Sequence, residues 1–101
     1  MPNRRVHDNE KHIHFVTFSC YKRRKYLQHD RARKIVIGNL GSRLAKHNGL
    51  CLGFVIMPDH VHALLWFPEP GQLSVLMNKW KSQSSLAIHH LYETEFPNYW
   101  A

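Results

Sequence analysis

The chain has 101 residues and a mass of 12.0 kDa, so we expect residues 1–101 to form a single domain with a modest hydrophobic core. Hydrophobic residues make up 44% and charged residues 21%, a globular composition that excludes a disordered chain. Fourteen Lys and Arg against seven Asp and Glu give a net charge of +7, which favours an anionic partner such as nucleic acid.

The cellular setting follows from two features of the sequence. No apolar run approaches the roughly 18 residues of a membrane span, and no apolar segment follows the charged N-terminus, so we expect no membrane partner and no signal peptide. Cys20 and Cys51 are too few for a disulfide scaffold or a CxxC metal knuckle. We predict that both are reduced thiols in the core of a cytoplasmic protein.

The first half of the chain predicts a strand and then a helix. Residues 12–20 (HIHFVTFSC) are rich in β-branched and aromatic residues, as strands are, and a basic turn follows at residues 21–25. Asp30 is a plausible N-cap for the helix, and Asn48-Gly49 is a strong stop. The expected buried stripe consists of Val36, Leu40 and Leu44, widened by Ala32, Ile35 and Ile37.

The second half predicts a hairpin and a second helix. Residues 50–57 are nearly all apolar and predict a strand buried on both faces, Pro58-Asp59 predicts a tight turn, and residues 60–67 predict the return strand. Ser74 could cap a helix over about residues 75–92. Its expected inner face carries Leu76, Trp80, Ala87 and Leu91, with Ser84 as the polar member of the row.

The resulting order, β-α-β-β-α, predicts an α+β fold of the ferredoxin-like type without its last strand. In that arrangement an antiparallel sheet carries its helices on one face, and the first and third strands lie side by side. The missing strand would leave one edge of the first strand unpaired, and a second copy of the chain could cover it. We therefore expect a homodimer through this edge.

His60 and His62 are the sharpest feature of the sequence. They stand at positions i and i+2 of a predicted strand, so both imidazoles point to one face and could hold one divalent metal with a third ligand from elsewhere. The alternative is chance in a chain with nine histidines, because the HxH pattern is short and common.

The residues around this pair are more specific. The hairpin Phe54–Trp66 (FVIMPDHVHALLW) resembles the HUH motif (His, hydrophobic residue, His) of the single-strand DNA transposases that use a catalytic tyrosine, and most of all their REP-associated, insertion-sequence branch. The match runs from Val55 to His62 with one extra residue, Ile56. The resemblance extends over about residues 12–100, including the basic turn and the helix segment 76–85.

This resemblance implies a function. Such enzymes bind hairpins in single-stranded DNA, and the two histidines with a third side chain hold Mg²⁺ or Mn²⁺ against the scissile phosphate. A tyrosine hydroxyl attacks and forms a phosphotyrosine intermediate. In the family this tyrosine lies on a later helix, beyond a segment that begins near Trp100. We therefore expect the last strand, the catalytic helix and the third ligand to be absent here, with Tyr99 a weak substitute and the chain alone inactive.

The basic residues predict where nucleic acid would bind. Lys22, Arg23, Arg24 and Lys25, with Arg31, Arg33 and Lys34, form one cluster, and Lys79 and Lys81 are further candidates on the second helix. Tyr21 and Tyr26 flank the first cluster and could stack on unpaired bases. Among the other histidines, His12 or His14 could approach the metal or make partly buried polar contacts, and His89-His90 would favour the negative pole of the second helix.

Two other functions remain open from the sequence. The same sheet and basic turn could bind nucleic-acid hairpins without cutting them. A less specific alternative is an unrelated metalloprotein that uses the HxH pair for a hydrolytic Zn²⁺.

Overall fold

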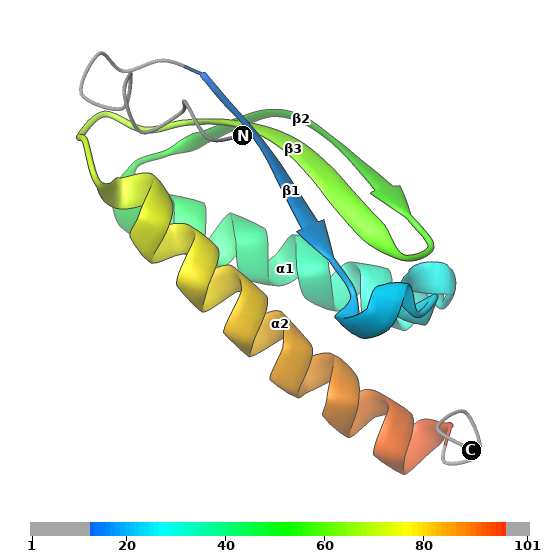
Figure 1. Ribbon diagram of the computed structural model, residues 1–101. Helices are drawn as coiled ribbons and strands as arrows, with labels where there is room; N and C mark the ends of the chain where they lie inside the picture. The colour runs from blue at the N-terminus through cyan, green and yellow to red at the C-terminus, as the bar shows by residue number, and fades with distance from the viewer. Residues whose placement is uncertain (1–12, 97–101) are drawn as a thin grey trace.

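The computed structural model describes residues 13–96 and confirms the predicted α+β architecture. Three strands and two long helices follow one another in the expected order (Figure 1). With η marking a short 3-10 helix, the elements are β1 (His14–Ser19), η3 (Tyr21–Arg23), η4 (Tyr26–Gln28), α1 (Asp30–His47), β2 (Leu50–Met57), β3 (His60–Trp66) and α2 (Gln72–Glu95).

The three strands form one antiparallel sheet in the order β1-β3-β2, so β3 is the central strand. β1 pairs with β3, as predicted, and places Thr17 opposite His62 and Ser19 opposite His60. β2 pairs with the other side of β3 and places Val55 opposite His62. Because side chains alternate between the two faces of a sheet, this register decides which residues share a face with the two histidines.

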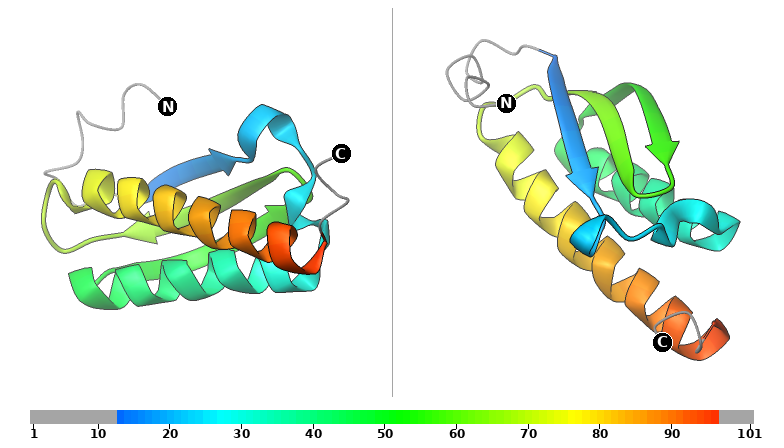
Figure 2. Two further views of the ribbon diagram at one scale, coloured as in Figure 1. Left: turned by 90° about the horizontal axis from the view of Figure 1, so that it is seen from below. Right: turned by 45° about the vertical axis from the view of Figure 1, so that its right-hand side comes forward.

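Both helices pack on the same face of the sheet, and we call the opposite face the outer face (Figures 1 and 2). The indole N–H of Trp80 on α2 donates to the carbonyl oxygen of Val36 on α1 at 3.0 Å. Phe18 of β1 meets the Trp80 ring edge to face, with centroids 5.1 Å apart. One buried indole thus joins the sheet to both helices, as the prediction of Trp80 as a core residue requires.

α1 follows the predicted stripe with one exception. Ala32, Val36, Leu40 and Leu44 are all buried, and Ile35 packs partly buried against them. Ile37 is instead 40% exposed, because the next residue along a helix is turned about 100° away from a buried one.

Of the two predicted ends of α1, the C-terminal one is confirmed and the N-terminal one is not. The prediction of Asp30 as the N-cap is wrong: it is the first helical residue, and its carboxylate accepts from Lys34 one turn later at 3.1 Å rather than from a backbone N–H. Asn48 ends the helix as predicted, in the left-handed conformation with φ of 55°. A Cβ at Gly49 would come within 2.9 Å of the side chains of Leu44 and Phe67, so this position also needs a glycine for space.

α2 is longer than predicted at both ends. It begins at Gln72 after Gly71, whose φ of 86° is left-handed, so the prediction of Ser74 as the cap is wrong. Ile88 replaces Ala87 in the buried row, and Ser84 is buried as the row predicted. The helix runs on to Glu95, so the histidines at 89 and 90 lie before its last turn, and His89 instead contacts Glu93 at 3.3 Å.

β2 is the clearest departure from the sequence prediction, because it is not buried on both faces. It is an edge strand, and most of its apolar side chains are exposed, among them Leu50 at 58% and Val55 at 55%. A register shift between Cys51 and Gly53 marks an irregularity in its pairing with β3. Cys51 is exposed as well, so the prediction of a core thiol fails there, whereas Cys20 is half-buried. In the described part of the chain, neither helix is long and apolar enough to cross a membrane.

Candidate metal and nucleic-acid site

His60 and His62, which we call the histidine pair, lie at the beginning of the central strand β3. Between and after them Val61, Ala63 and Leu65 are buried against the helices, so both histidines point to the outer face. This is the arrangement that the HxH spacing predicts for a strand. The pair directly follows the Pro58-Asp59 turn and therefore stands at one end of the sheet rather than in its middle.

The two imidazoles are close enough to act together. Their ring centroids are 4.7 Å apart and their planes are inclined by 82°. Two imidazoles that share one octahedral ion, at about 2.1 Å from each nitrogen, have centroids roughly 4.5–5 Å apart. Both rings are half-buried, and the His60 side chain is 19% exposed. The pair is therefore ordered by its neighbours and still reachable, and its separation fits a shared divalent ion.

Asp59 contacts the first of the two rings. Nδ1 of His60 lies 2.6 Å from Oδ1 of Asp59, and Oδ2 of the same carboxylate accepts from Nε of Arg23 at 3.0 Å. The hydrogen bond to His60, and then that to Arg23, hold the pKa of the Asp59 carboxyl below its usual range. Asp59 is therefore ionised at neutral pH, with each of its oxygens in contact with a different side chain.

Two residues of β1 contact the second ring. The hydroxyl of Thr17 lies 3.1 Å from Nδ1 of His62, and the ring of Phe15 stacks on the imidazole with centroids 5.3 Å apart and planes inclined by 16°. In both histidines Nδ1 therefore lies beside an oxygen of a neighbouring side chain, and a ring whose Nδ1–H donates to that oxygen has its lone pair on Nε2 for an ion.

The described residues do not supply a third ligand of the usual kinds. Among residues 13–96, no group of three His, Cys, Asp or Glu side chains is placed to hold an ion. His14, one of two predicted candidates, is 4% exposed and points to the helix side of the sheet, away from the histidine pair. The other candidate, His12, lies outside the described residues.

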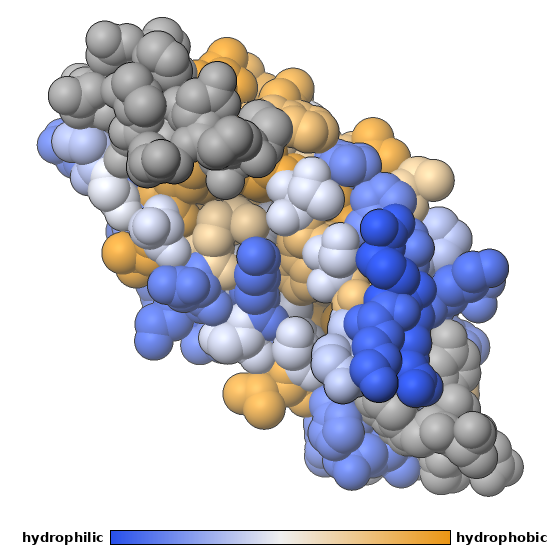
Figure 3. Space-filling view, viewed as in Figure 1, coloured by the Kyte–Doolittle hydropathy of each residue, from blue (hydrophilic) through white to orange (hydrophobic). Residues whose placement is uncertain are grey.

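The basic turn that follows β1 lies beside the histidine hairpin. The backbone N–H of Cys20 donates to the carbonyl oxygen of Asp59 at 2.9 Å, and that of Leu27 donates to the carbonyl oxygen of Pro58 at 2.9 Å. The segment between them, residues 21–26, is thus pinned to the hairpin turn at both ends. Figure 3 shows a strongly hydrophilic band over this part of the molecule, at the right of the view. The fold therefore brings the predicted basic turn next to the predicted metal site.

A comparison with protein families identifies the family of this chain. A family described as "Transposase IS200 like" matches residues 8–101. The chain is an IS200-like transposase by family. This confirms the resemblance drawn from the histidine hairpin and gives the chain a transposase-like function with DNA as the partner. Transposases of this kind are in general metal-dependent. A comparison with curated proteins gave no match.

The basic side chains of this transposase differ in their contacts: some bind carboxylate or carbonyl groups of the protein, and others are exposed. Arg31 pairs with Glu95, Lys34 pairs with Asp30, and Arg33 donates to the carbonyl oxygens of Leu27 and Gln28. In the basic turn, Lys22 lies over the ring of Tyr21 at 5.4 Å, Arg23 contacts Asp59, and Arg24 and Lys25 are exposed. Lys79 and Lys81 are exposed on α2, which packs on the face of the sheet opposite the histidine pair.

Of the three tyrosines among residues 13–96, two are buried away from the histidine pair. Tyr26 and Tyr92 are buried in the core, with ring centroids 5.3 Å apart, and the hydroxyl of Tyr92 donates to the carbonyl oxygen of Tyr26. The prediction that Tyr26 stacks on a base is therefore wrong, because its ring faces other core aromatics. Tyr21 is 71% exposed and remains a candidate for stacking. Tyr99, the weak candidate nucleophile, lies outside the described residues.

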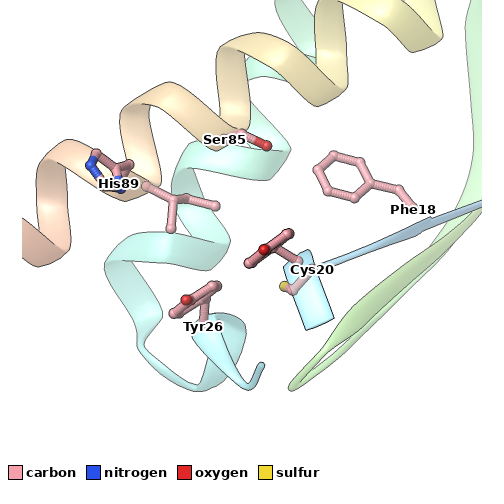
Figure 4. Close-up of a pocket in the computed structure, with 7 residues that line it drawn as sticks. Phe18, Cys20, Tyr26, Ser85 and His89 are labelled. Carbon is pink, nitrogen blue, oxygen red and sulfur yellow. The ribbon is translucent and has the colours of Figure 1, made fainter. Parts of the chain in front are cut away.

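A cavity of about 310 Å³ opens on the helix side of the sheet, between the end of β1 and α2 (Figure 4). Its walls are Phe18, Cys20, Tyr21, Tyr26, Ser85, Ile88 and His89. In the figure Ser85 and His89 extend from α2, and Phe18, Cys20 and Tyr26 lie across the cavity from that helix. The lining is mostly apolar and contains neither histidine of the pair, so this cavity is separate from the candidate metal site.

The sequence predicted the two histidines but missed the side chains that hold them. Thr17 and Phe15 could have been suggested by pairing the first strand with the third, because that pairing was expected and the alternation then puts them on the histidine face. The contact between Arg23 and Asp59 had no comparable signal, since it depends on the shape of a turn that contains no glycine or proline.

Proposed function

We propose that this transposase-family chain binds hairpins in single-stranded DNA, and that His60 and His62 hold Mg²⁺ or Mn²⁺ against a DNA phosphate. The observation that carries the proposal is the histidine pair itself. Two imidazoles with centroids 4.7 Å apart stand on the outer face of the sheet, each with its Nδ1 beside an oxygen of a neighbouring side chain. We treat residues 1–101 as a single domain of the HUH type.

The chemistry of the site follows from its parts. A divalent ion held by the pair would act as a Lewis acid on the bound phosphate. The imidazoles contribute neutral nitrogen ligands, so the site keeps the full charge of the ion for the phosphate. Arg23, 61% exposed and beside His60, brings guanidinium N–H groups to the edge of the site, with its charge balanced by Asp59. The chain's own residues thus bind and orient a phosphate.

The basic turn supplies the proposed DNA contacts. Lys22, Arg24 and Lys25 project from a segment whose two ends are bonded to the histidine hairpin, so a strand that reaches the pair passes these cations. Tyr21 beside them offers an exposed ring for an unpaired base. We propose Lys79 and Lys81 as secondary phosphate contacts, because they lie on the helix layer rather than on the face of the pair.

One observation favours the second candidate function, a DNA-binding protein that does not cut. Of the tyrosines among residues 13–96, two are buried and the third lines the cavity on the helix side of the sheet. The hydroxyls of Tyr26 and Tyr92 lie in the core and cannot attack a phosphate at the histidine pair without a large rearrangement. We therefore propose that the chain by itself binds DNA and the ion, and forms no phosphotyrosine adduct.

We also propose that the chain forms a homodimer through the outer edge of β1. Within residues 13–96, β1 pairs only with β3, so its other side presents unpaired backbone groups. Sedimentation of the purified protein over a range of concentrations tests this. A monomer at all concentrations would contradict the proposal.

The central experiment measures binding of a fluorescent single-stranded DNA hairpin with and without Mn²⁺. We expect Mn²⁺ to tighten binding to the wild-type protein, and a His60→Ala/His62→Ala double variant to lose that gain while keeping the binding seen without metal. His90→Ala, an exposed histidine on α2, is the matched control and should behave as wild type. Equal binding of duplex DNA, or no effect of Mn²⁺ on the wild type, would contradict the proposed function. If Zn²⁺ alone is retained on purification, the hydrolytic zinc alternative is favoured instead.

A further inference from the structure

We propose that Asp59 and Arg23 are positioning residues for His60: Asp59 fixes the imidazole so that Nε2 is presented to the ion, and Arg23 fixes Asp59. The inference rests on the proposed metal-binding function and deepens it. It assigns a task to the basic turn besides DNA contact, because Arg23 belongs to that turn.

The first step concerns the proton on His60. A carboxylate can only accept hydrogen bonds, so the 2.6 Å contact with Oδ1 of Asp59 requires that Nδ1 carries the hydrogen. The neutral ring then has its lone pair on Nε2, which is the form that binds a metal ion. The guanidinium of Arg23 lies 3.4 Å from the same Nδ1, but it cannot donate to a nitrogen that already carries a hydrogen. Its hydrogen bond goes to Asp59 instead.

The second step concerns the carboxylate. Oδ1 of Asp59 is engaged by His60 and Oδ2 by Nε of Arg23 at 3.0 Å, so the carboxylate plane is held from both sides. An Asp59 that ligated the ion directly would have to release one of these partners. The structure therefore favours Asp59 as the residue behind the ligand rather than as a ligand, which is the usual arrangement around metal-bound histidine.

The third step explains why Arg23 reaches Asp59 at all. Lys22 and Arg23 both have left-handed backbones, with φ of 52° and 54°, a conformation that costs energy in residues other than glycine. Backbone hydrogen bonds stabilise this turn, from Arg23 N–H to the Cys20 carbonyl and from Arg24 N–H to the Tyr21 carbonyl, at 2.9 and 3.1 Å. The ion pair itself adds little, because Arg23 is 61% exposed. The left-handed turn therefore places the guanidinium of Arg23 beside Asp59.

The test measures Mn²⁺ affinity of the full chain without DNA, by electron paramagnetic resonance, and the tautomer of His60, by long-range ¹⁵N–¹H NMR. Asp59→Ala should weaken Mn²⁺ binding by about 10- to 100-fold, as loss of such partners does, and convert His60 from the Nδ1–H form to a mixture of tautomers. Asp59→Asn should retain the Nδ1–H form of His60, since the side-chain carbonyl of Asn still accepts a hydrogen bond. It should lose the hydrogen bond from Arg23, because an amide NH₂ would face the guanidinium. Arg23→Gln should weaken Mn²⁺ binding severalfold, and Arg24→Gln, its exposed neighbour, should not.

The outcomes separate this inference from the proposed function. If His60→Ala abolishes Mn²⁺ binding while Asp59→Ala binds as wild type and keeps the Nδ1–H form, the positioning role is overturned and the metal site stands. If the wild type binds no Mn²⁺, the proposed metal function fails, and the tautomer of Asp59→Ala still decides whether Asp59 orients the ring. Thermal unfolding of each variant shows whether a loss of affinity reflects a loss of fold.

Discussion

Phe15 stacks on the imidazole of His62, with the two rings 5.3 Å apart between centroids and 16° from parallel. The hydroxyl of Thr17, two residues along the same strand, lies 3.1 Å from Nδ1 of that ring. β1 therefore supports His62, whereas the hairpin turn and Arg23 support His60. Because the two rings depend on different segments, their supports can be removed one at a time.

Removing the hydroxyl beside His62 tests the support from β1. Thr17→Val keeps the shape of the side chain but deletes the partner of Nδ1, so we expect Mn²⁺ affinity to fall by about tenfold. The free energy of unfolding should change by less than ~1 kcal/mol, because the residue is exposed. Ser19→Ala, a hydroxyl loss on the same face of β1, is the control. A Thr17→Val variant that binds Mn²⁺ as tightly as the wild type would rule out a role for Thr17.

The sequence predicted the order of the elements and the pairing of β1 with β3, but not the exposure of β2. A run of apolar residues such as 50–57 is typical of a strand covered on both faces. In the structure β3 is the central strand. Its residues alternate between the two faces of the sheet, with Val61, Ala63 and Leu65 buried and the histidines between them half-buried. The position of a strand within its sheet depends on the whole topology, which the composition of that strand does not contain.

The candidate site, like the fold, could be predicted from the sequence only in part. The spacing of His60 and His62 alone predicts a shared face, because alternation is a property of the strand itself. Apart from Asp59, the neighbours of the pair come from residues about 37 to 47 positions away, through the register of β1 and the left-handed turn at Lys22 and Arg23. Neither Lys nor Arg favours the left-handed conformation, so the local sequence does not predict this turn.

The core depends on the indole of Trp80, and its truncation should be costly. Trp80→Phe removes the hydrogen bond to the Val36 carbonyl and leaves a gap against Phe18. We expect a loss of roughly 2–3 kcal/mol in the free energy of unfolding, about 1 from the hydrogen bond and the rest from the gap. Urea unfolding measures it. Leu86→Ala, at a site 71% exposed on the same helix, should change stability by less than about 0.5 kcal/mol.

The salt dependence of DNA binding tests the basic turn. If Lys22 and Arg24 each contact a phosphate, a Lys22→Gln/Arg24→Gln variant should reduce the slope of log affinity against log salt by roughly 1.4, about 0.7 per contact on a single strand. Lys79→Gln/Lys81→Gln changes the charge by the same amount and should reduce the slope by less. Titrations of a fluorescent hairpin between 50 and 200 mM salt measure both. Equal slopes for the two double variants would assign DNA binding to net charge rather than to the turn.

The two thiols should differ in reactivity. Cys51 is exposed on the edge strand, whereas burial raises the pKa of the half-buried Cys20 thiol. A raised pKa leaves less thiolate at neutral pH, and the thiolate is the form that reacts. Iodoacetamide at pH 7.5 should therefore modify Cys51 first, with Cys20 following more slowly, as mass spectrometry of timed samples would show. In a Cys51→Ser variant only the slow reaction should remain, and a fast reaction there would contradict the burial of Cys20.

The first turn of α1 should make stability depend on pH in the acid range. The hydrogen bond and charge of Lys34, with a smaller contribution from Arg33, lower the pKa of the Asp30 carboxyl from its ordinary value of 3.8. Because the folded state has the lower pKa, the stabilisation is complete above the unfolded value and disappears as the pH falls through the folded one. The difference in unfolding free energy between wild type and Asp30→Asn should therefore be constant from pH 7 to about pH 5 and shrink below pH 4. Urea unfolding of both proteins at each pH measures this difference, and one that stayed constant down to pH 2 would show that Asp30 gains nothing from its neighbours in the folded state.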